Sequence, residues 1–167
     1  LVALAIRGAG TDYEDDAKRF LDSWAKRIPE ECIPAFDEMG GVWSESMGHG
    51  NYGPIAVIPW ALEAWRTATG EDFFQLGTRA TYLKGMTLWA VNLTVPQSNE
   101  TAWIDDNRAA NLSGFARVAP ILGARYRDPV ANAISDKSRR ENWHSIPWHR
   151  FLFYDPTVRS STPQDAG

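Results

Sequence analysis

Apolar residues recur at three- and four-residue steps over most of this chain, a spacing typical of the buried face of an α-helix. Phe20, Leu21, Trp24 and Ile28 give the clearest example. No convincing alternation of apolar and polar residues, which would indicate a strand, occurs before Phe151. The sequence therefore predicts an all-α fold in which helices form antiparallel hairpins.

Glycine and proline mark where the expected helices begin and end. The first segment is a helix end at 1–6, stopped by Gly8 and Gly10. A second helix is expected to begin with Thr11 or Asp12 as its N-cap and to end at the glycines at 40–41. Within it, the prolines at 29 and 34 are expected to kink or interrupt the helix.

The remaining chain divides in the same way. The expected helices lie at about 54–69, 71–93, 109–126 and 129–140. The run HRFLFYDP, residues 149–156, is expected to form either a last helical turn or the beginning of a strand. The polar tail from Thr157 is expected to be loose.

Composition limits the classes of function. With 167 residues, 44% of them hydrophobic, the chain can build the core of one ordinary domain. Its net charge of -4 argues against non-specific nucleic-acid binding, and no apolar run is long enough to cross a membrane. The single cysteine, Cys32, excludes an internal disulfide and is expected to be a buried helical residue. No cofactor and no metal site is expected.

Tryptophan is unusually frequent, with eight residues in the chain. An indole offers a flat apolar face and one N–H donor, which suits a sugar ring that carries both C–H and O–H groups. About half of these residues are expected to fill the core, and the others are candidates for carbohydrate contacts.

The stretch GGVWSESMGHGNYG, residues 40–53, combines a glycine-rich backbone with chemically active side chains. Trp43, Glu45, His49 and Tyr52 lie within ten positions of one another. Glycines let a backbone turn sharply and approach a wide ligand, while flanking helices hold the ends of such a loop. The pattern therefore predicts a binding loop rather than a spacer.

This stretch resembles the pattern G-G-x-W-x-E-G-x-G-Y-x-x-Y of the heparinase II/III-like and alginate-lyase-like polysaccharide lyases. The residues in step with it are Gly40, Gly41, Trp43, Glu45, Gly48 and Tyr52. Ser46 replaces a usual glycine, and His49 stands where the first tyrosine is common. The segment that follows, GPIAVIPWALEAWRTATGEDFF, and the later run WHRFLFYDP also resemble this family. The likeness extends from about Leu1 to Pro156.

The resemblance implies an incomplete (α/α) toroid followed by a β-sandwich. Residues 1–156 would then be the C-terminal part of the toroid catalytic domain, and residues 157–167 a polar tail leading toward an absent β-sandwich. This part would pack against missing N-terminal toroid helices, where the family keeps an Asn-His pair implicated in catalysis. The family likeness further implies an acidic polysaccharide as substrate and a periplasmic or extracellular location.

These lyases cleave uronic-acid polymers by β-elimination, which implies roles for the motif residues. Tyr52 is the expected general acid and a candidate base, and His49 is a second proton-transfer group or a partner for the sugar carboxylate. Glu45 is expected to orient these groups or a sugar hydroxyl, Trp43 to form a wall for a pyranose ring, and Asn51 to bind substrate.

A second cluster lies in the polar segment before the helix expected at 109–126. Trp103, Asp105, Asp106 and Arg108 are candidates for substrate binding at the same cleft. The alternative is that the two aspartates are ordinary N-cap residues of the following helix. Two adjacent aspartates do not make a metal site.

Basic residues concentrate in one part of this acidic chain. Residues 117–150 contain seven Lys and Arg residues against three Asp and Glu residues. Such a segment can steer a polyanion, although an ordinary solvated helix surface has the same composition. His144 and His149, each next to a tryptophan, are expected either at the cleft rim or at the interface with the β domain.

Two other functions remain open from the sequence. An (α/α)-toroid glycoside hydrolase needs paired carboxylates, which Glu45 with Asp105 or Asp106 can supply. A non-catalytic helical carbohydrate-binding fragment would use the aromatic residues alone. A lyase differs from both because it leaves an unsaturated sugar that absorbs in the near ultraviolet.

Overall fold

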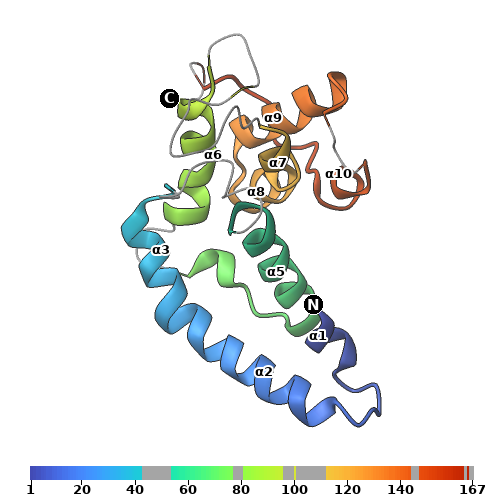
Figure 1. The fold of residues 1–167 in the computed structure, drawn as a ribbon. Coiled ribbons are helices and arrows are strands. Elements are labelled where there is room, and N and C mark those ends of the chain that lie inside the picture. Colours follow the sequence, from blue (N-terminus) through green and yellow to red (C-terminus); the bar gives the residue numbers. More distant parts are fainter. Residues whose placement is uncertain are drawn as a thin grey trace.

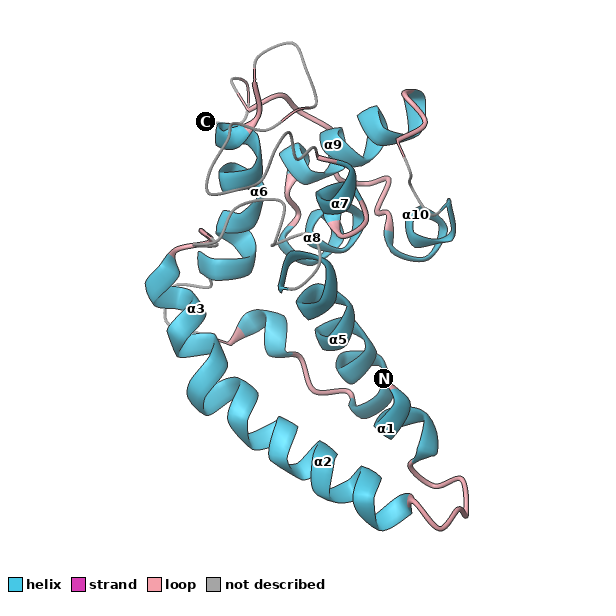
Figure 2. Ribbon diagram, viewed as in Figure 1, coloured by secondary structure: helices cyan, strands magenta, loops and turns pink. Residues whose placement is uncertain are grey.

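The structure is a computed structural model that describes residues 1–42, 54–76, 81–95, 100, 112–143, 147–163 and 165. Across these ranges the regular elements are all helical and no strand is present (Figures 1 and 2). The predicted all-α class is therefore confirmed. No helix in the described ranges has both the length and the apolar character needed to cross a bilayer.

The chain begins with a short helix and a long one that pack against each other. Helix α1 spans Val2–Ile6, and α2 spans Glu14–Arg27. The predicted N-caps Thr11 and Asp12 are wrong, because Tyr13 is the N-cap and makes no side-chain capping bond. Instead Glu14 reaches back, and its Oε1 accepts a hydrogen bond of 2.8 Å from the backbone N–H of Gly10.

The prolines interrupt the second helix, but the chain stays helical through the interruption. A π-helical segment, Ile28–Cys32, joins α2 to α3, which spans Ile33–Met39. Two side chains differ from expectation: Phe20 is 59% exposed, and Cys32 is partly exposed. Phe20 lines an apolar groove that the described residues leave open.

The middle of the chain contains two longer helices. Helix α5 spans Pro54–Thr69 and accommodates Pro59, while α6 spans Thr81–Leu93. The helix expected from residue 71 is wrong in its first turns, since only a 3-10 turn, Phe73–Gln75, forms there. Asp72 caps this turn by accepting a hydrogen bond of 2.9 Å from the backbone N–H of Phe74.

The C-terminal part is a cluster of four helices. They are α7 Ser113–Ala116, α8 Ala119–Tyr126, α9 Pro129–Arg140 and α10 Pro147–Phe153. The single helix expected at 109–126 is thus divided in its described part, with Pro120 in the first turn of its second piece. The run at 149–156 is helical to Phe153, which decides between the two readings of that segment.

The start of the tail is docked rather than loose. Val158 is buried, and the backbone N–H of Ser161 donates a hydrogen bond of 3.1 Å to the carbonyl of Pro129. The buried Asn132 of α9 donates through Nδ2 to the carbonyls of Asp155 and Val158, at 3.0 and 2.8 Å. Polar composition alone misled the prediction, because these bonds are made to a helix distant in the sequence.

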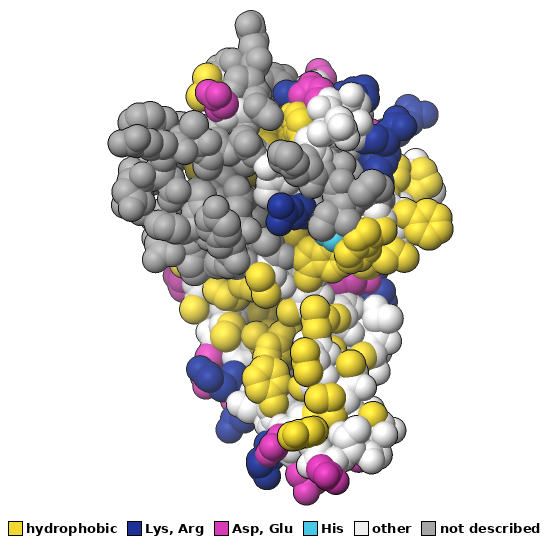
Figure 3. Space-filling view, turned by 45° about the vertical axis from the view of Figure 1, so that its right-hand side comes forward, with side chains coloured by type: hydrophobic (Ala, Val, Ile, Leu, Met, Phe, Trp, Pro, Cys, Tyr) yellow, Lys and Arg dark blue, Asp and Glu magenta, His cyan; other side chains and the backbone are white. Residues whose placement is uncertain are grey.

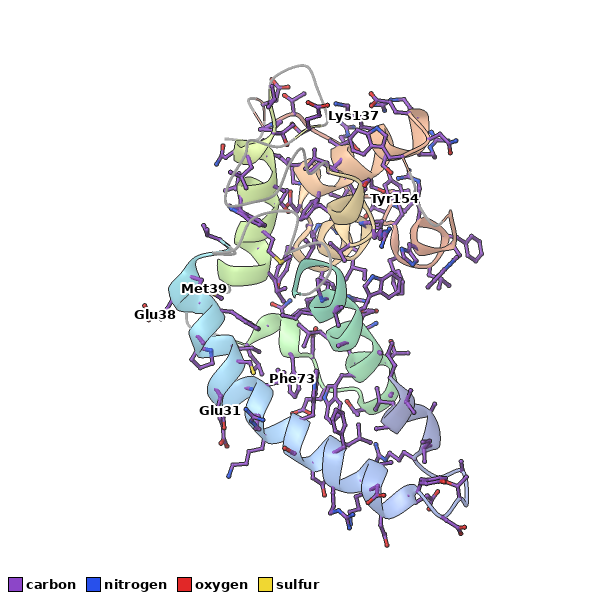
Figure 4. The ribbon with its side chains drawn as sticks, viewed as in Figure 1. Glu31, Glu38, Met39, Phe73, Lys137 and Tyr154 are labelled. Carbon is purple, nitrogen blue, oxygen red and sulfur yellow. The ribbon has the colours of Figure 1, made fainter. Side chains whose placement is uncertain are left out.

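One hydrophobic core connects the helices. It includes an aromatic group in which Phe73 stacks on Trp24 and Trp65, and the three rings lie at centroid distances of 5.1 to 5.7 Å. Figure 4 shows Phe73 between α2 and α5. Most described indoles are used in this way, since Trp24, Trp60, Trp65, Trp89 and Trp143 all belong to the core or pack against it. Tryptophan therefore serves the core more than the sequence suggested.

One face of the helical assembly remains apolar and uncovered by described residues. Figure 3 shows hydrophobic side chains gathered over the lower part of this face. A groove of about 840 Å³ lies there between α1, α2 and α5. Its lining includes the exposed side chains of Leu1, Val2, Tyr13, Phe20 and Val57.

Candidate functional site

All the predicted site residues lie outside the described part of the chain. They are Trp43, Glu45, His49, Asn51, Tyr52, Trp103, Asp105, Asp106 and Arg108. His144 also falls outside it. Their proposed roles therefore stay predictions, and the described residues define the helices on both sides of the motif.

The first two residues of the motif are described, and both glycines have a positive φ. Gly40 ends α3 in the left-handed conformation with φ of 61°, and Gly41 follows with φ of 90°. A Cβ placed on Gly41 would be 2.4 Å from the backbone carbonyl carbon of Gly85 in α6. A Cβ on Gly85 would in turn be 2.6 Å from the carbonyl oxygen of Gly40. This close approach fixes where the motif leaves the helices.

A buried ion-pair network lies on α5, beyond the motif. Glu63 is 4% exposed and accepts hydrogen bonds from Arg66 and from Arg125 of α8. Burial alone would raise the pKa of Glu63, but the hydrogen bonds and charges of the two guanidinium groups hold it below its ordinary value. The carboxylate is fully engaged by these partners, so its role is to join α5 to α8.

The basic segment noted in the sequence forms a pocket in the C-terminal helix cluster. A cavity of about 520 Å³ is lined by residues of α7, α8, α9 and α10. Arg117, Arg139 and Arg150 contribute positive charge, and no described lining residue is acidic. We call this the arginine pocket. Its volume lies within the range of small-ligand sites, roughly 300 to 1,000 Å³.

Arg150 is held by an extensive network at one wall of the arginine pocket. Its Nη2 lies 2.6 Å from Oδ1 of Asp136, and its Nη1 donates a hydrogen bond of 2.8 Å to Oγ of Ser135. The guanidinium carbon lies 3.4 Å from the ring centroid of Tyr154, a residue that Figure 4 labels in the C-terminal helix cluster. The charge of Arg150 is therefore largely neutralised by Asp136.

Asp136 receives further bonds that keep it ionised. Tyr154 and Ser160 donate hydrogen bonds to its Oδ2, at 3.3 and 2.5 Å. Burial alone would raise the pKa of Asp136, but the bond from Ser160 and the charge and bonds of Arg150 hold it below its usual range. The wall that contains Arg150 is thus rigid and electrically almost neutral.

Some of the other polar groups of the arginine pocket lack a hydrogen-bond partner among the described residues. Three of its lining residues have a buried side-chain atom without a hydrogen-bond partner among the described residues. These atoms are Nε of Arg117, Oγ of Ser138 and Nδ1 of His149. An unsatisfied buried polar group costs about 1–3 kcal/mol, so three such atoms beside one cavity make the arginine pocket a candidate ligand site.

His149 lies at the junction of the pocket with the aromatic core. Its ring centroid is 4.0 Å from those of Trp60 in α5 and Trp148 in α10. The side chain of His149 is 6% exposed among the described residues, so it is enclosed by the helices beside the arginine pocket. Burial lowers the pKa of His149 to about 4, so the ring is neutral near pH 7.

The arginine pocket was only partly predictable from the sequence. The excess of basic residues between 117 and 150 was visible, but its division between pocket lining and ordinary surface was not. Arg139 lines the cavity, whereas its neighbour Arg140 does not. Ser135 and Ser138 gave no functional signal, because serines three residues apart on a helix are unremarkable until a neighbouring helix faces them.

Comparisons of the chain with protein-family models, with curated proteins and with solved structures found no match. In addition, the described residues contain no group of three or more His, Cys, Asp or Glu side chains arranged to hold a metal ion. Any function assigned to this chain therefore depends on its own residues and their geometry.

Proposed function

We propose that this chain is part of the (α/α)-toroid catalytic domain of a polysaccharide lyase that cleaves a uronic-acid polymer. The observation that carries the proposal is the order and spacing of the motif residues from Gly40 to Tyr52. The described start of this motif supports it, because the two glycines stand where the backbone has positive φ and where Gly41 meets α6. The backbone conformation therefore favours glycine at both positions, and the contact with α6 requires it at Gly41.

The chemistry assigned to the motif is β-elimination. A base removes the proton on the carbon that carries the carboxylate, a carbon–carbon double bond forms, and the neighbouring glycosidic C–O bond breaks. An acid then protonates the departing oxygen. Tyr52 is assigned the acid role and His49 the second proton transfer, and such help contributes roughly a hundred- to ten-thousand-fold in rate. Donors around the sugar carboxylate stabilise the developing negative charge.

The uncovered apolar face supports the assignment of this chain to part of a larger helical ring. Leu1 and Val2 are both more than 70% exposed, and together with Tyr13 and Phe20 they line the groove between α1, α2 and α5. Exposed apolar surface of this extent is typical of an interface. Further toroid helices are the proposed partners of this face, and a C-terminal β-sandwich is the proposed partner at the other end.

The test is lyase activity on uronate polymers, measured by the ultraviolet absorbance of the unsaturated product in the full polypeptide that contains this chain. Tyr52→Phe is expected to reduce turnover at least a hundredfold while substrate binding survives. Tyr13→Phe is the matched control, because it removes a phenol hydroxyl that makes no capping bond and keeps the ring that lines the apolar groove. Cleavage that yields reducing ends without the absorbing product would identify a hydrolase and overturn the proposal.

A further inference from the structure

The arginine pocket carries positive charge that the described residues leave uncompensated. Of its three arginines, only Arg150 forms an ion pair with a described residue, Asp136. Arg117 and Arg139 form none within the described ranges, and the acidic Glu141 at the end of α9 accepts from Trp143 instead. A cavity with two free guanidinium groups and no acidic lining attracts an anion.

Arg117 places part of this positive charge in the wall of the arginine pocket. Arg117 follows α7 directly, its side chain lines the pocket, and its buried Nε has no described partner. Ser138, from the facing side of α9, lies almost wholly buried in the wall with an unpartnered hydroxyl. Guanidinium and hydroxyl groups are the donors that bind carboxylate, sulfate and phosphate oxygens, and arginine does so in bidentate geometry.

The pocket also has an apolar side. Phe151 lines it and is 87% exposed, an unusual position for a large aromatic ring. Pro120 and Pro156 add further apolar surface to the same lining. An inorganic ion would make no use of this surface, whereas an organic molecule can place C–H groups against the ring of Phe151.

We propose that the arginine pocket is a binding site for an organic oxyanion, in which Arg117 and Arg139 hold the charged group and Phe151 contacts the body of the ligand. The ligand class is a small carboxylate-bearing molecule of sugar size. The choice of a sugar acid rests on the proposed function, whereas the charge, the unpartnered donors and the aromatic wall do not.

The first experiment measures binding of glucuronate to the full polypeptide by calorimetry, with neutral glucose as the comparison. Arg139→Gln is expected to weaken glucuronate binding about tenfold, because one charge-assisted hydrogen bond is lost. Arg140→Gln is the matched control: it removes the same charge from the same exposed last turn of α9, outside the pocket. Equal weakening by both variants would show only a diffuse charge effect and would overturn the site.

The second experiment distinguishes binding of an organic anion from binding of an inorganic anion. Phe151→Ala is expected to weaken glucuronate binding several-fold and to leave inorganic phosphate binding unchanged. Leu152→Ala is its control, since Leu152 is the next residue of α10, is exposed, and lies outside this pocket. Phosphate that binds as tightly as glucuronate, or glucose that binds as well, would overturn the proposed ligand class.

The two proposals fail in different ways. Tyr52→Phe is expected to abolish lyase turnover without changing the dissociation constant of glucuronate at the arginine pocket. Glucuronate binding that depends on Arg139 in a polypeptide without lyase activity would leave the pocket in place and overturn only the proposed function. Absence of glucuronate binding in an active lyase would overturn the pocket alone.

Discussion

Gly41 and Gly85 are in backbone-to-backbone contact, although 44 positions separate them in the sequence. A Cβ on Gly41 would lie 2.4 Å from the carbonyl carbon of Gly85, a distance that no real Cβ tolerates. The end of α3 and the middle of α6 are therefore joined at a point where only glycine fits. The proposed catalytic motif begins at this junction, so the junction connects helix packing with the loop.

Gly41→Ala is expected to destabilise the protein by about 3 kcal/mol or more, because the new methyl group meets backbone that cannot move independently. Gly40→Ala is the control. Gly40 has a similar positive φ of 61°, but nothing lies within 4 Å of its Cβ position. Its expected cost is about 1 kcal/mol, from the left-handed conformation alone. Urea unfolding of both variants makes the comparison, and equal costs would contradict the close contact.

Glu63→Gln is expected to lower the free energy of unfolding by about 2–4 kcal/mol at pH 7, because Arg66 and Arg125 lose their shared counter-ion. The figure is below that of a fully buried pair, since both arginines are partly exposed. Glu31→Gln, which breaks the exposed Arg27–Glu31 pair at 3.0 Å, is the control, and its cost is expected to be much smaller because solvent screens an exposed pair. If Glu63→Gln lowers the free energy of unfolding no more than this control does, the network does not join the helices.

His149 is expected to make the stability of the protein fall as the pH drops from about 6.5 toward 4. Burial lowers its folded-state pKa to about 4, while the unfolded chain takes up the proton near the ordinary value of 6.5. The unfolded state therefore binds more protons in this range, and the difference between the two pKa values of His149 corresponds to at most about 3 kcal/mol of stability. His149→Gln should flatten the slope of unfolding free energy against pH in this window.

The carboxylates of Glu63 and Asp136 affect stability at lower pH than His149 does, so they do not obscure the effect of His149 between pH 6.5 and 4.5. Glu63 and Asp136 both have lowered pKa values, so their stabilising effect is fully present above the ordinary carboxyl pKa values and is lost as the pH falls through the folded-state values. Wild type and the His149→Gln variant share that loss. An unchanged slope between pH 6.5 and 4.5 in the variant would show that the imidazole is not buried in neutral form.

Asn132→Ala is expected to release the segment after α10. The buried side chain donates to the carbonyls of Asp155 and Val158, so its removal leaves two acceptors unpaired and costs about 2–4 kcal/mol. Amide hydrogen exchange at Ser161, whose N–H bonds the carbonyl of Pro129, should become much faster. Asn92→Ala, at an exposed position of α6, should alter neither measurement.

Local sequence signals were enough to predict where several helices begin or end. Helix α9 begins after the capping Asp128 and ends at Arg140 as predicted, because the cap, the proline in the first turn and the apolar spacing all lie within one segment. The glycine stops after α1 and α5 are confirmed for the same reason: a positive φ at Gly8 and Gly70 is a property of the local backbone.

The bounds of other helices were predicted incorrectly, because they depend on contacts with residues distant in the sequence. Acidic residues at 71–72 suggested a helix start, but the following Phe73 and Phe74 are drawn into the core and only one 3-10 turn forms. The expected helix at 109–126 is divided near Arg117. This division places the Arg117 side chain toward α9 and α10 and makes it part of the arginine pocket.

The sequence by itself determined that this chain is helical, where most helices end, and that a glycine-rich motif with Trp43, Glu45, His49 and Tyr52 follows α3. These properties arise from backbone preferences and apolar spacing within short segments. Only the tertiary structure decided that Gly41 needs Gly85, that Glu63 joins two arginines, and that Arg117 and Arg139 share a cavity with Phe151. Such contacts are set by how helices pack, since packing brings together residues that no local pattern relates.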